Sequence, residues 1–314
     1  MRIVIDMQGA QTESRFRGIG RYTLSFAQAI ARNSDEHEIF LALNGLFPET
    51  IDPIRAAFDG LLPQENICVW HAPGPVAEER SDNNARREAA ELIREAFLAN
   101  LQPDIIHISS LFEGYVDDAV TSIGNFDQTT PVSVQLYDLI PLLNPDQYLK
   151  PKLNYQKHYE RKSNHLMRAS SLLAISEFSR QEGVEHLDVV PERVVNVSTA
   201  IEDCFCPLEL SEEDASRITA KFNITQPFIL YTGGADGRKN LPRLIQAYAA
   251  LPAPLRASHQ LLFAGKMPEG NIAEFKHLAK SAGLNPDELC FTGYITDEEL
   301  IQLNNLCELY IFPS

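Results

Sequence analysis

Short apolar segments alternate with helical segments along this chain, and this alternation restricts the fold more than any other feature of the sequence. The apolar segments carry apolar, often β-branched, residues at consecutive positions, which is typical of parallel strands that helices cover on both faces. We predict strands over residues 2–7, 38–43, 66–71, 104–109, 131–137, 171–175 and 193–198, with helices that include residues 22–31, 85–100 and 154–167. This order predicts an α/β fold with a doubly wound sheet.

The alternation stops at residues 201–214, an acidic stretch without a clear period, and then restarts. We interpret this stretch as a connection between domains, with Ser211 as the N-cap of the next helix. The second half predicts strands in PFILYTGG, HQLLFAGK, ELCFTGYI and ELYIFPS, separated by helices over residues 241–251, 272–282 and 297–306. The predicted domains are residues 1–203 and 204–314. No crossover helix follows the last strand, so we expect the second domain to be incomplete.

Charge and composition limit the classes of function. The chain has 27 Lys and Arg residues against 43 Asp and Glu residues, a net charge of −16 that repels nucleic acid. Its five cysteines form no CxxC pair, and no metal site is predicted. No apolar run reaches the length of a membrane span, and the amino terminus reads as a buried strand, which favours the cytoplasm. A phosphate site in this protein must therefore be a local cationic spot.

A glycine-containing segment, RFRGIGRY, lies between the first strand and the first helix. Gly18 and Gly20 would let backbone approach a ligand closely, and the amino terminus of the helix offers N–H donors to an anion. The segment lacks the third glycine and the acidic ribose partner of a nicotinamide site. A purely structural turn remains an equal alternative.

The segment YTGGADGRKN is the most informative part of the sequence. A strand runs into a glycine-rich loop, and Arg238 and Lys239 follow at the start of a helix, with Asn240 as a plausible N-cap and Pro242 in the first turn. Two cations beside a helix amino terminus predict a local diphosphate site in an acidic protein. The alternative is a surface Arg-Lys pair.

Three weaker candidates lie in the first domain. Asp138 closes an apolar strand, where its carboxylate could orient a substrate hydroxyl or only cap a turn. His107 stands at the end of another strand and is a weak candidate for acceptor binding. A basic stripe, with members at helical spacing, predicts contact with lipid phosphate or an anionic acceptor, against the plainer interpretation of a solvated face. Its members are Lys157, Arg161, His165 and Arg168.

Seven motifs occur in one order along the chain: RGIGRYT, YDLIP, AISEFSR, YTGGADGRKN, FAGK, FTGYITDEEL and LYIFPS. Through them the chain resembles the family 4 (group 1) glycosyltransferases of GT-B architecture, and it is most similar to bacterial mannosyltransferases of O-antigen and exopolysaccharide assembly. The resemblance implies two Rossmann-like domains. The first would hold the acceptor, and the second the nucleotide sugar.

The same resemblance implies roles for individual residues. Arg238 and Lys239 would neutralise the leaving diphosphate, and Asp138 would face the reacting sugar. Gly18, Gly20 and Gly234 would contact the donor, and Tyr294 and Ile295 would line the nucleobase pocket. The implied reaction is retaining transfer of a hexose, mannose from GDP-mannose, to a lipid-linked glycan at the inner face of the membrane. No cofactor or metal is expected besides the nucleotide sugar, and the sequence contains no DxD motif.

The chain departs from the family pattern at two places. Tyr137 stands where many relatives have a histidine before the strand-end aspartate, and the E-x7-E segment that follows FPS in the family would lie beyond Ser314. We therefore expect no measurable transferase turnover from residues 1–314. Two alternatives stay open: a non-catalytic remnant or binding subunit of a glycosyltransferase, and a nicotinamide-dependent oxidoreductase.

Overall fold

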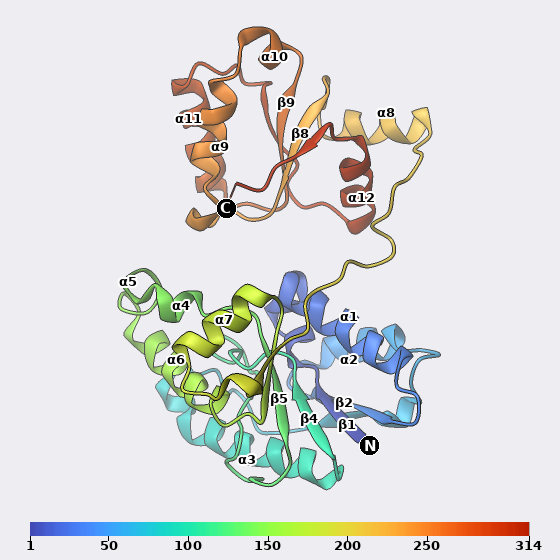
Figure 1. Ribbon diagram of the computed structural model, residues 1–314, viewed down its shortest axis with the longest axis vertical. Coiled ribbons are helices and arrows are strands. Elements are labelled where there is room, and N and C mark those ends of the chain that lie inside the picture. Colours follow the sequence, from blue (N-terminus) through green and yellow to red (C-terminus); the bar gives the residue numbers. More distant parts are fainter. Residues whose placement is uncertain (314) are drawn as a thin grey trace. The chain divides into compact units, whose positions relative to one another are not determined.

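The computed structural model describes residues 1–313 and divides the chain into two compact units, Met1–Ala200 and Ile201–Ser314. We call them the first lobe and the second lobe. The predicted boundary, between residues 203 and 204, falls just inside the second lobe. Each lobe is an α/β unit built on one parallel sheet (Figure 1).

The first lobe contains a seven-stranded parallel sheet with the order β3-β2-β1-β4-β5-β6-β7. The strands are β1 (Arg2–Asp6), β2 (Glu38–Asn44), β3 (Ile67–Trp70), β4 (Ile105–Ile108), β5 (Val132–Leu136), β6 (Ser171–Ala174) and β7 (Val194–Asn196). The chain starts in the middle of the sheet, builds outward to β3, and then returns to build outward on the other side from β4. The order of strands therefore reverses between β1 and β4.

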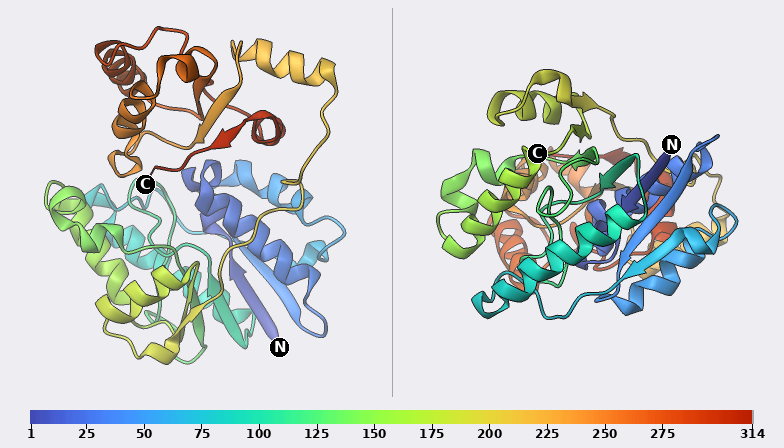
Figure 2. Two further views of the ribbon diagram at one scale, coloured as in Figure 1. Left: turned by 45° about the horizontal axis from the view of Figure 1, so that its top comes forward. Right: turned by 90° about the horizontal axis from the view of Figure 1, so that it is seen from below.

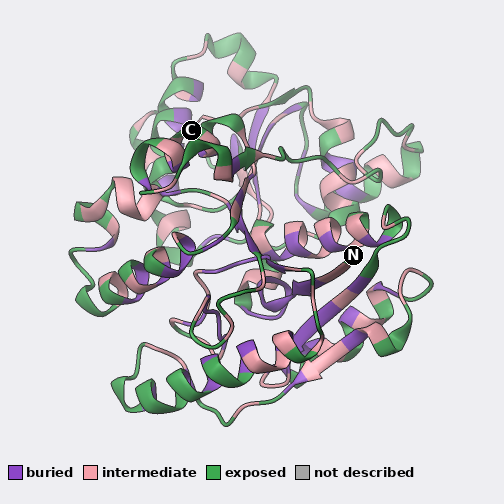
Figure 3. Cartoon of the chain, turned by 60° about the horizontal axis from the view of Figure 1, so that its bottom comes forward, coloured by how far each residue is buried: buried purple, intermediate pink, exposed green. Residues whose placement is uncertain are grey.

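Helices cover both faces of this sheet, and consecutive residues of β1 show why. Ile5 packs in a core cluster with residues of α1 and α2, whereas Val4 packs in a second cluster with residues of α3 and α6. Both side chains are fully buried, and Figure 3 shows that burial concentrates on the strands and on the inner faces of the helices. The helices are α1 (Gly18–Arg32), α2 (Pro48–Ala57), α3 (Asn84–Asn100), α4 (Ile140–Leu143), α5 (Pro145–Tyr148), α6 (Leu153–Leu166) and α7 (Glu177–His186).

The second lobe repeats this plan with four parallel strands in the order β10-β9-β8-β11. Its elements are α8 (Glu212–Lys221), β8 (Phe228–Thr232), α9 (Leu241–Ala249), α10 (Ala253–Ala257), β9 (Gln260–Ala264), α11 (Glu269–Ser281), β10 (Leu289–Phe291), α12 (Asp297–Leu306) and β11 (Leu309–Tyr310). Helices α9 and α11 pack together on one face, and α8 and α12 pack together on the other (Figures 1 and 2).

The predicted elements are present. Each of the eleven predicted strands corresponds to one of β1–β11. Ser211 caps α8 as predicted, because its hydroxyl accepts a hydrogen bond from the Asp214 N–H at 3.1 Å. Helix α1 spans Gly18–Arg32 and so includes the predicted residues 22–31. The last predicted strand reaches Ser314, which lies outside the described residues.

A buried polar network joins β1 to α3 in the first lobe. Asp6 and Arg94 are each 1% exposed and form an ion pair, with the Arg94 Nε donating to Asp6 Oδ2 at 2.6 Å. Gln8 donates to both oxygens of the same carboxylate and to the Val120 carbonyl. Further hydrogen bonds stabilise the buried pair, from Gln8 to Asp6 and from Arg94 Nη1 to the Ser122 carbonyl at 3.2 Å.

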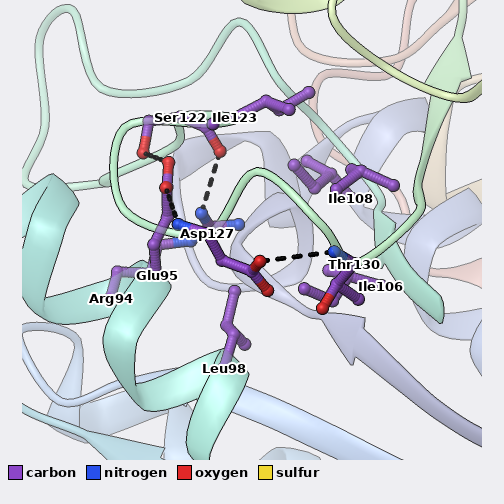
Figure 4. A pocket seen from close by; sticks show the side chains of 11 residues that line it. Arg94, Glu95, Leu98, Ile106, Ile108, Ser122, Ile123, Asp127 and Thr130 are labelled. Atoms are coloured by element: carbon purple, nitrogen blue, oxygen red, sulfur yellow. Dashed lines mark hydrogen bonds between the residues drawn. The ribbon is translucent and has the colours of Figure 1, made fainter. Parts of the chain in front are cut away.

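Figure 4 shows a small pocket beside this network, lined by Arg94 and Glu95 of α3, by Ile106 and Ile108 of β4 and by residues between β4 and β5. It encloses only about 20 Å³, and the Glu95 carboxylate accepts a hydrogen bond from Ser122 Oγ at 2.6 Å. The pocket lies between α3 and the face of the sheet, and not beyond the carboxyl ends of the strands, where ligands of open α/β sheets bind. We therefore do not consider it a candidate functional site.

Over residues 1–313, no helix combines the length and the apolar character that crossing a bilayer requires.

Because Asp6 and Arg94 form a buried ion pair, we predict that removing one partner greatly lowers the stability of the first lobe. Replacing Arg94 with Met leaves Asp6 charged and buried, so we expect the first lobe to lose about 3–5 kcal/mol of unfolding free energy. The single tryptophan, Trp70, is 2% exposed in β3, so its fluorescence during denaturation reports on this lobe. The control Arg32→Met, at the exposed end of α1, should change stability by no more than about 0.5 kcal/mol. Equal losses in the two variants would contradict the prediction.

Candidate functional site

The sheet of the second lobe has a switch point between β8 and β11. After β8 the chain builds β9 and β10 on one side, and it then returns to place β11 on the other side of β8. Loops diverge at such a point, and open α/β sheets bind ligands there, beyond the carboxyl ends of the strands. The Thr232 and Tyr310 hydroxyl oxygens, at the ends of these two strands, are 2.8 Å apart.

The glycine loop after β8 has one glycine that the fold requires and one that faces open space. Gly233 has a φ of 141°, and a Cβ atom there would lie 2.8 Å from the Tyr231 hydroxyl oxygen. At Gly234 no atom lies within 4 Å of the Cβ position. The Tyr231 hydroxyl donates to the Gly234 carbonyl at 3.0 Å and so holds the loop in place. Gly234 therefore offers a backbone surface that a ligand could approach.

Arg238 and Lys239 lie in a short 3-10 turn, Gly237–Lys239, that directly precedes α9. The Asp236 carboxylate accepts from the Arg238 N–H at 3.0 Å and lies 3.4 Å from the Arg238 Nε. The Arg238 side chain is about half exposed (49%), so its guanidinium can still reach a ligand. Because the loop contains one carboxylate, Asp236, and two cations, Arg238 and Lys239, its net charge is +1. The sequence-based prediction counted the two cations and not the carboxylate.

Lys239 packs against an aromatic ring contributed by the segment after β11. Its Nζ lies 4.3 Å from the centre of the Phe312 ring, a cation–π contact. Partial burial, followed by repulsion from Arg238, lowers the pKa of Lys239. The Phe312 ring is 52% exposed and is stacked on Tyr231, with the ring centres 6.4 Å apart. This contact holds the ammonium group at the switch point.

Asn240 is the N-cap residue of α9, as predicted, but its side chain does not make the capping hydrogen bond. Asn240 adopts a left-handed conformation with φ of 56°, and its Nδ2 donates to the Pro313 carbonyl at 3.5 Å. Pro242 lies in the first turn as predicted and has no N–H. The Arg243 N–H donates to the Asn240 carbonyl at 3.1 Å, so the start of α9 offers an anion the Leu241 N–H and not a set of free donors.

A third cation, Lys266, follows β9 at the same edge of the sheet. It is exposed, and the preceding Gly265 has a φ of 128°. A Cβ atom on Gly265 would lie 3.0 Å from the Gly233 carbonyl oxygen, so the two glycine turns are in contact. The FAGK motif ends in Lys266, but no role was predicted for this lysine from the sequence. Its position directly after a strand-end glycine is the pattern that could have identified Lys266 as a site residue.

Tyr294 and Ile295 do not share one environment. Tyr294 is 74% exposed beyond the end of β10, where a planar ligand could stack on its ring. Ile295 packs against the core cluster that contains Phe228 and Leu303. Of the two residues predicted to line a nucleobase pocket, only Tyr294 presents its ring to solvent.

The two predicted glycines of the first lobe have different roles. Gly18 is the first residue of α1, and no atom lies within 4 Å of its Cβ position, so a ligand can approach it. At Gly20 a Cβ atom would lie 2.2 Å from the Arg15 Cα and 2.5 Å from the Ser14 carbonyl oxygen. Gly20 is therefore required by the protein's own backbone, and the prediction that it contacts a ligand is not supported by its surroundings.

Asp138 lies at the carboxyl edge of the first-lobe sheet, directly beyond β5, and is exposed. Its Oδ1 accepts from the Ile140 N–H at 3.1 Å, which supports the start of α4. The turn-capping interpretation is therefore correct, and it leaves the exposed carboxylate able to meet a substrate. The preceding Tyr137 is held by a hydrogen bond from its hydroxyl to the Ser109 carbonyl at 3.1 Å.

His107 lies in the core and not at an open strand end, so the structure corrects its prediction as an acceptor-binding residue. It is 3% exposed, its Nδ1 is 3.0 Å from Ser133 Oγ, and its ring packs against Phe26. Burial lowers the pKa of His107 to about 4, so the ring is neutral at physiological pH.

The predicted basic stripe on and just after α6 is corrected in part, because Arg161 and His165 are held inside the first lobe, whereas Lys157 and Arg168 are exposed. Arg161 donates to Glu78 and to Glu91, with a distance of 2.7 Å to the Glu91 Oε1. His165 is buried with its Nδ1 3.1 Å from the Ile123 carbonyl oxygen, and Arg168 donates to the same carbonyl. Only Lys157 is exposed without such a contact among the described residues. A single lysine is a weak basis for binding lipid phosphate.

No three His, Cys, Asp or Glu side chains within residues 1–313 are grouped as a metal site would require.

Comparison with known proteins gives the sequence relatives. Residues 212–314 match the family model described as glycosyl transferases group 1. The chain is 36% identical over 315 residues to the serotype-specific mannosyltransferase WbdA of Escherichia coli, covering all of this chain and 37% of that protein. It is 24% identical to the O-antigen chain mannosyltransferase B of Escherichia coli, covering 95% of this chain and 72% of that protein. The chain thus spans little more than a third of WbdA.

Solved structures share the fold at low sequence identity. The Anabaena protein Alr3699/HepE, in complex with UDP and glucose, superimposes with a TM-score of 0.62 at 15% identity, covering 99% of this chain and 73% of that protein. WaaG, a glycosyltransferase involved in lipopolysaccharide biosynthesis, gives a TM-score of 0.58 at 15% identity, covering 100% of this chain and 75% of that protein. The α/β architecture of the two lobes is therefore GT-B.

Because Gly18 and Gly20 have different surroundings, we predict that alanine at these two positions has opposite effects on the stability of the first lobe. Gly20→Ala should lower the unfolding free energy of the first lobe by at least about 1–3 kcal/mol, because the methyl group would overlap backbone atoms. Gly18→Ala should leave it unchanged or raise it by up to about 1 kcal/mol, because alanine favours the helix and meets open space. Denaturation followed by Trp70 fluorescence measures both. A Gly18 variant that loses more stability than the Gly20 variant would refute this assignment.

The burial of Lys162 on α6 leads us to predict that the stability of the first lobe depends on pH. It is 1% exposed and donates to the Thr121 carbonyl at 2.7 Å, and burial lowers its pKa to about 7. In the unfolded chain its pKa is about 10.4, so the unfolded state binds more protons between these values, and stability rises with pH from about 7 to 10. Lys162→Met removes this contribution. The denaturation midpoint of the wild type should therefore rise relative to that of Lys162→Met over this pH range. Parallel curves of midpoint against pH for the two proteins would contradict the prediction.

Proposed function

Because this chain belongs to the group 1 glycosyltransferases, we propose that it serves the retaining transfer of mannose from GDP-mannose to a lipid-linked glycan in polysaccharide biosynthesis. The observation that carries this proposal is the cationic turn at the switch point of the second lobe. Arg238 and Lys239 lie there beside a glycine loop, directly before the N-cap residue of α9. These features suit a diphosphate, which the donor of such a reaction releases.

The chemistry of the proposed reaction explains why cations are needed. The bond between the anomeric carbon and the diphosphate breaks as positive charge develops on the sugar and negative charge develops on the leaving group. Fixed positive groups where the negative charge accumulates lower the barrier. We assign this role to Arg238, which is half exposed, and to Lys239, which Phe312 holds in position. Lys266 adds a third cation for the diphosphate.

The identity of the donor is supported by the relatives. WbdA and the O-antigen chain mannosyltransferase B are mannosyltransferases, and mannose is therefore the proposed sugar. The Anabaena structure contains UDP and glucose, so the base is a separate question for this chain, and we propose guanine. Tyr294 would stack on the base, and Gly234 would let the phosphates approach the backbone.

The first lobe would serve the acceptor. Asp138 would accept a hydrogen bond from a sugar hydroxyl, and Gly18, at the open start of α1, would let a ligand approach the backbone closely. A lipid-linked acceptor would bring the protein to the inner membrane face, with Lys157 as the exposed cation of α6. No metal or further cofactor is proposed. A nicotinamide-dependent reaction lacks support, because the first-lobe loop has no third glycine and the relatives are transferases.

The diphosphate assignment predicts separate effects of two neighbouring substitutions. Arg238→Ala and Lys239→Ala should each weaken binding of GDP to this chain by about tenfold, or roughly 1.4 kcal/mol, because each removes a charge-assisted contact. Isothermal titration calorimetry measures the dissociation constants. The matched control is Lys280→Ala, an exposed cation in the last turn of α11, which should bind GDP as the wild type does.

Two results would count against the assignment: no saturable binding of any nucleoside diphosphate, or equal affinity in all four proteins. Titration with UDP under the same conditions tests the base. GDP should bind more tightly than UDP, and the reverse order would replace guanine by uracil without changing the diphosphate site.

A further inference from the structure

The two adjacent cations of the second-lobe turn are held by partners of different chemistry. The Asp236 Oδ1 lies 3.4 Å from the Arg238 Nε, so a carboxylate partly neutralises this guanidinium. The Lys239 Nζ instead lies 4.3 Å from the centre of the Phe312 ring. An aromatic ring attracts a cation through its quadrupole and carries no net charge. This second contact therefore holds the ammonium group and leaves its charge available to a ligand.

The core of the second lobe supports the Phe312 ring from behind. The ring stacks on Tyr231, with the ring centres 6.4 Å apart and the planes at 24°. Tyr231 is fully buried and packs edge-on against Phe263, with the ring centres 5.6 Å apart. Phe312 itself remains 52% exposed. The ring is thus backed by the core while part of its surface stays open at the switch point, where the Lys239 ammonium lies.

The backbone on both sides of Phe312 is also fixed. On one side the Ile311 N–H donates to the Leu230 carbonyl of β8 at 2.8 Å. On the other side the Pro313 carbonyl accepts from the Asn240 Nδ2 at 3.5 Å, next to the turn that carries the lysine. Because both neighbours of Phe312 are bound to the second lobe, the ring has a defined position relative to that turn.

A ring is better suited than a carboxylate to hold a lysine that must bind an anion. A lysine side chain loses rotamer freedom when a ligand orders it, and a contact formed before the ligand arrives removes part of this cost. A carboxylate would also order the lysine, but it would cancel the charge that a phosphate needs. The ring occupies one side of the ammonium group, so N–H donors remain for phosphate oxygens.

We propose that Phe312 is a positioning residue for the diphosphate: its ring holds the Lys239 ammonium, and it contributes to binding through this lysine and not by touching the ligand. The inference rests on the proposed function and adds an uncharged residue to the same site. It also separates the two cations, because Arg238 is held by Asp236 and not by the ring. Affinity for GDP should therefore depend on Phe312 only while Lys239 is present.

The test is a double-mutant cycle in which calorimetry measures the GDP dissociation constant of the whole chain. Phe312→Leu keeps an apolar side chain against Tyr231 but has no π face, so it should weaken GDP binding about fivefold. The same change should weaken binding about fivefold in an Arg238→Ala background, but less than about twofold in a Lys239→Ala background. If Phe312 served only to pack the lobe, the loss would be equal in both backgrounds.

Two further variants control for packing. Phe312→Tyr keeps the aromatic face and should bind GDP within about twofold of the wild type. The matched control is Phe126→Leu, the same substitution at an exposed position (58%) in the loop before β5 of the first lobe. It should bind GDP as the wild type does.

A measurement on the ligand-free wild type needs no substitution of Phe312. After reductive methylation, which keeps the positive charge of lysines, NMR should show one N-methyl resonance shifted upfield by the ring current of Phe312. The absence of this resonance in Lys239→Ala assigns it to Lys239. This result tests the contact itself even where Phe312→Leu does not fold.

Four results would refute the inference: no ring-current shift at Lys239, GDP binding by Phe312→Leu as by the wild type, binding by Phe312→Tyr as weak as by Phe312→Leu, or an equal loss in the Lys239→Ala background. With GDP binding that depends on Lys239, each of these overturns this inference alone. Absence of GDP binding by the wild type overturns the proposed function, and this inference with it.

Discussion

Parallel pairing of the strands is the constraint from which the rest of this structure follows. Each parallel connection must cross over the sheet, so the helices lie on the faces and every loop after a strand emerges at one edge. Both sheets are parallel throughout, and each reverses its order once, between β1 and β4 and between β8 and β11. Polar residues far apart in sequence are thereby collected at the carboxyl edges. Asp138 lies at one such edge, and Arg238 and Lys239 lie at the other.

A chain with a net charge of −16 can still bind an anion, because the binding groups act over a short distance. Screening by salt limits surface charges to about 10 Å, so the distant carboxylates matter less than the groups in contact. At the second-lobe edge the near groups are three cations (Arg238, Lys239 and Lys266), the Asp236 carboxylate and the Leu241 N–H at the start of α9. The contact between Lys239 and Phe312 holds one cation in position, and Asp236 moderates the local charge.

The carboxyl edges of the two lobes differ in chemistry although their folds are alike. The second-lobe edge combines glycines with cations, which suits phosphate groups. The first-lobe edge carries the exposed carboxylate of Asp138, which suits a hydroxyl group. Arg161 of α6 is paired with Glu78 and Glu91 inside the first lobe, and Lys157 is the exposed cation of that helix.

The order of strands and helices, the Ser211 cap and the position of the glycine loop were predictable from sequence, because they depend on local patterns of apolar residues and on turn chemistry. The accessibility of the candidate residues was not predictable in this way. Helical spacing put Arg161 and His165 on one stripe but could not show that Arg161 is paired with Glu78 and Glu91 or that His165 lies against the Ile123 carbonyl. Gly18 and Gly20 look equivalent in sequence, yet only the packing of Ser14 and Arg15 against Gly20 separates them. Burial and pairing depend on contacts between distant segments, which local patterns do not encode.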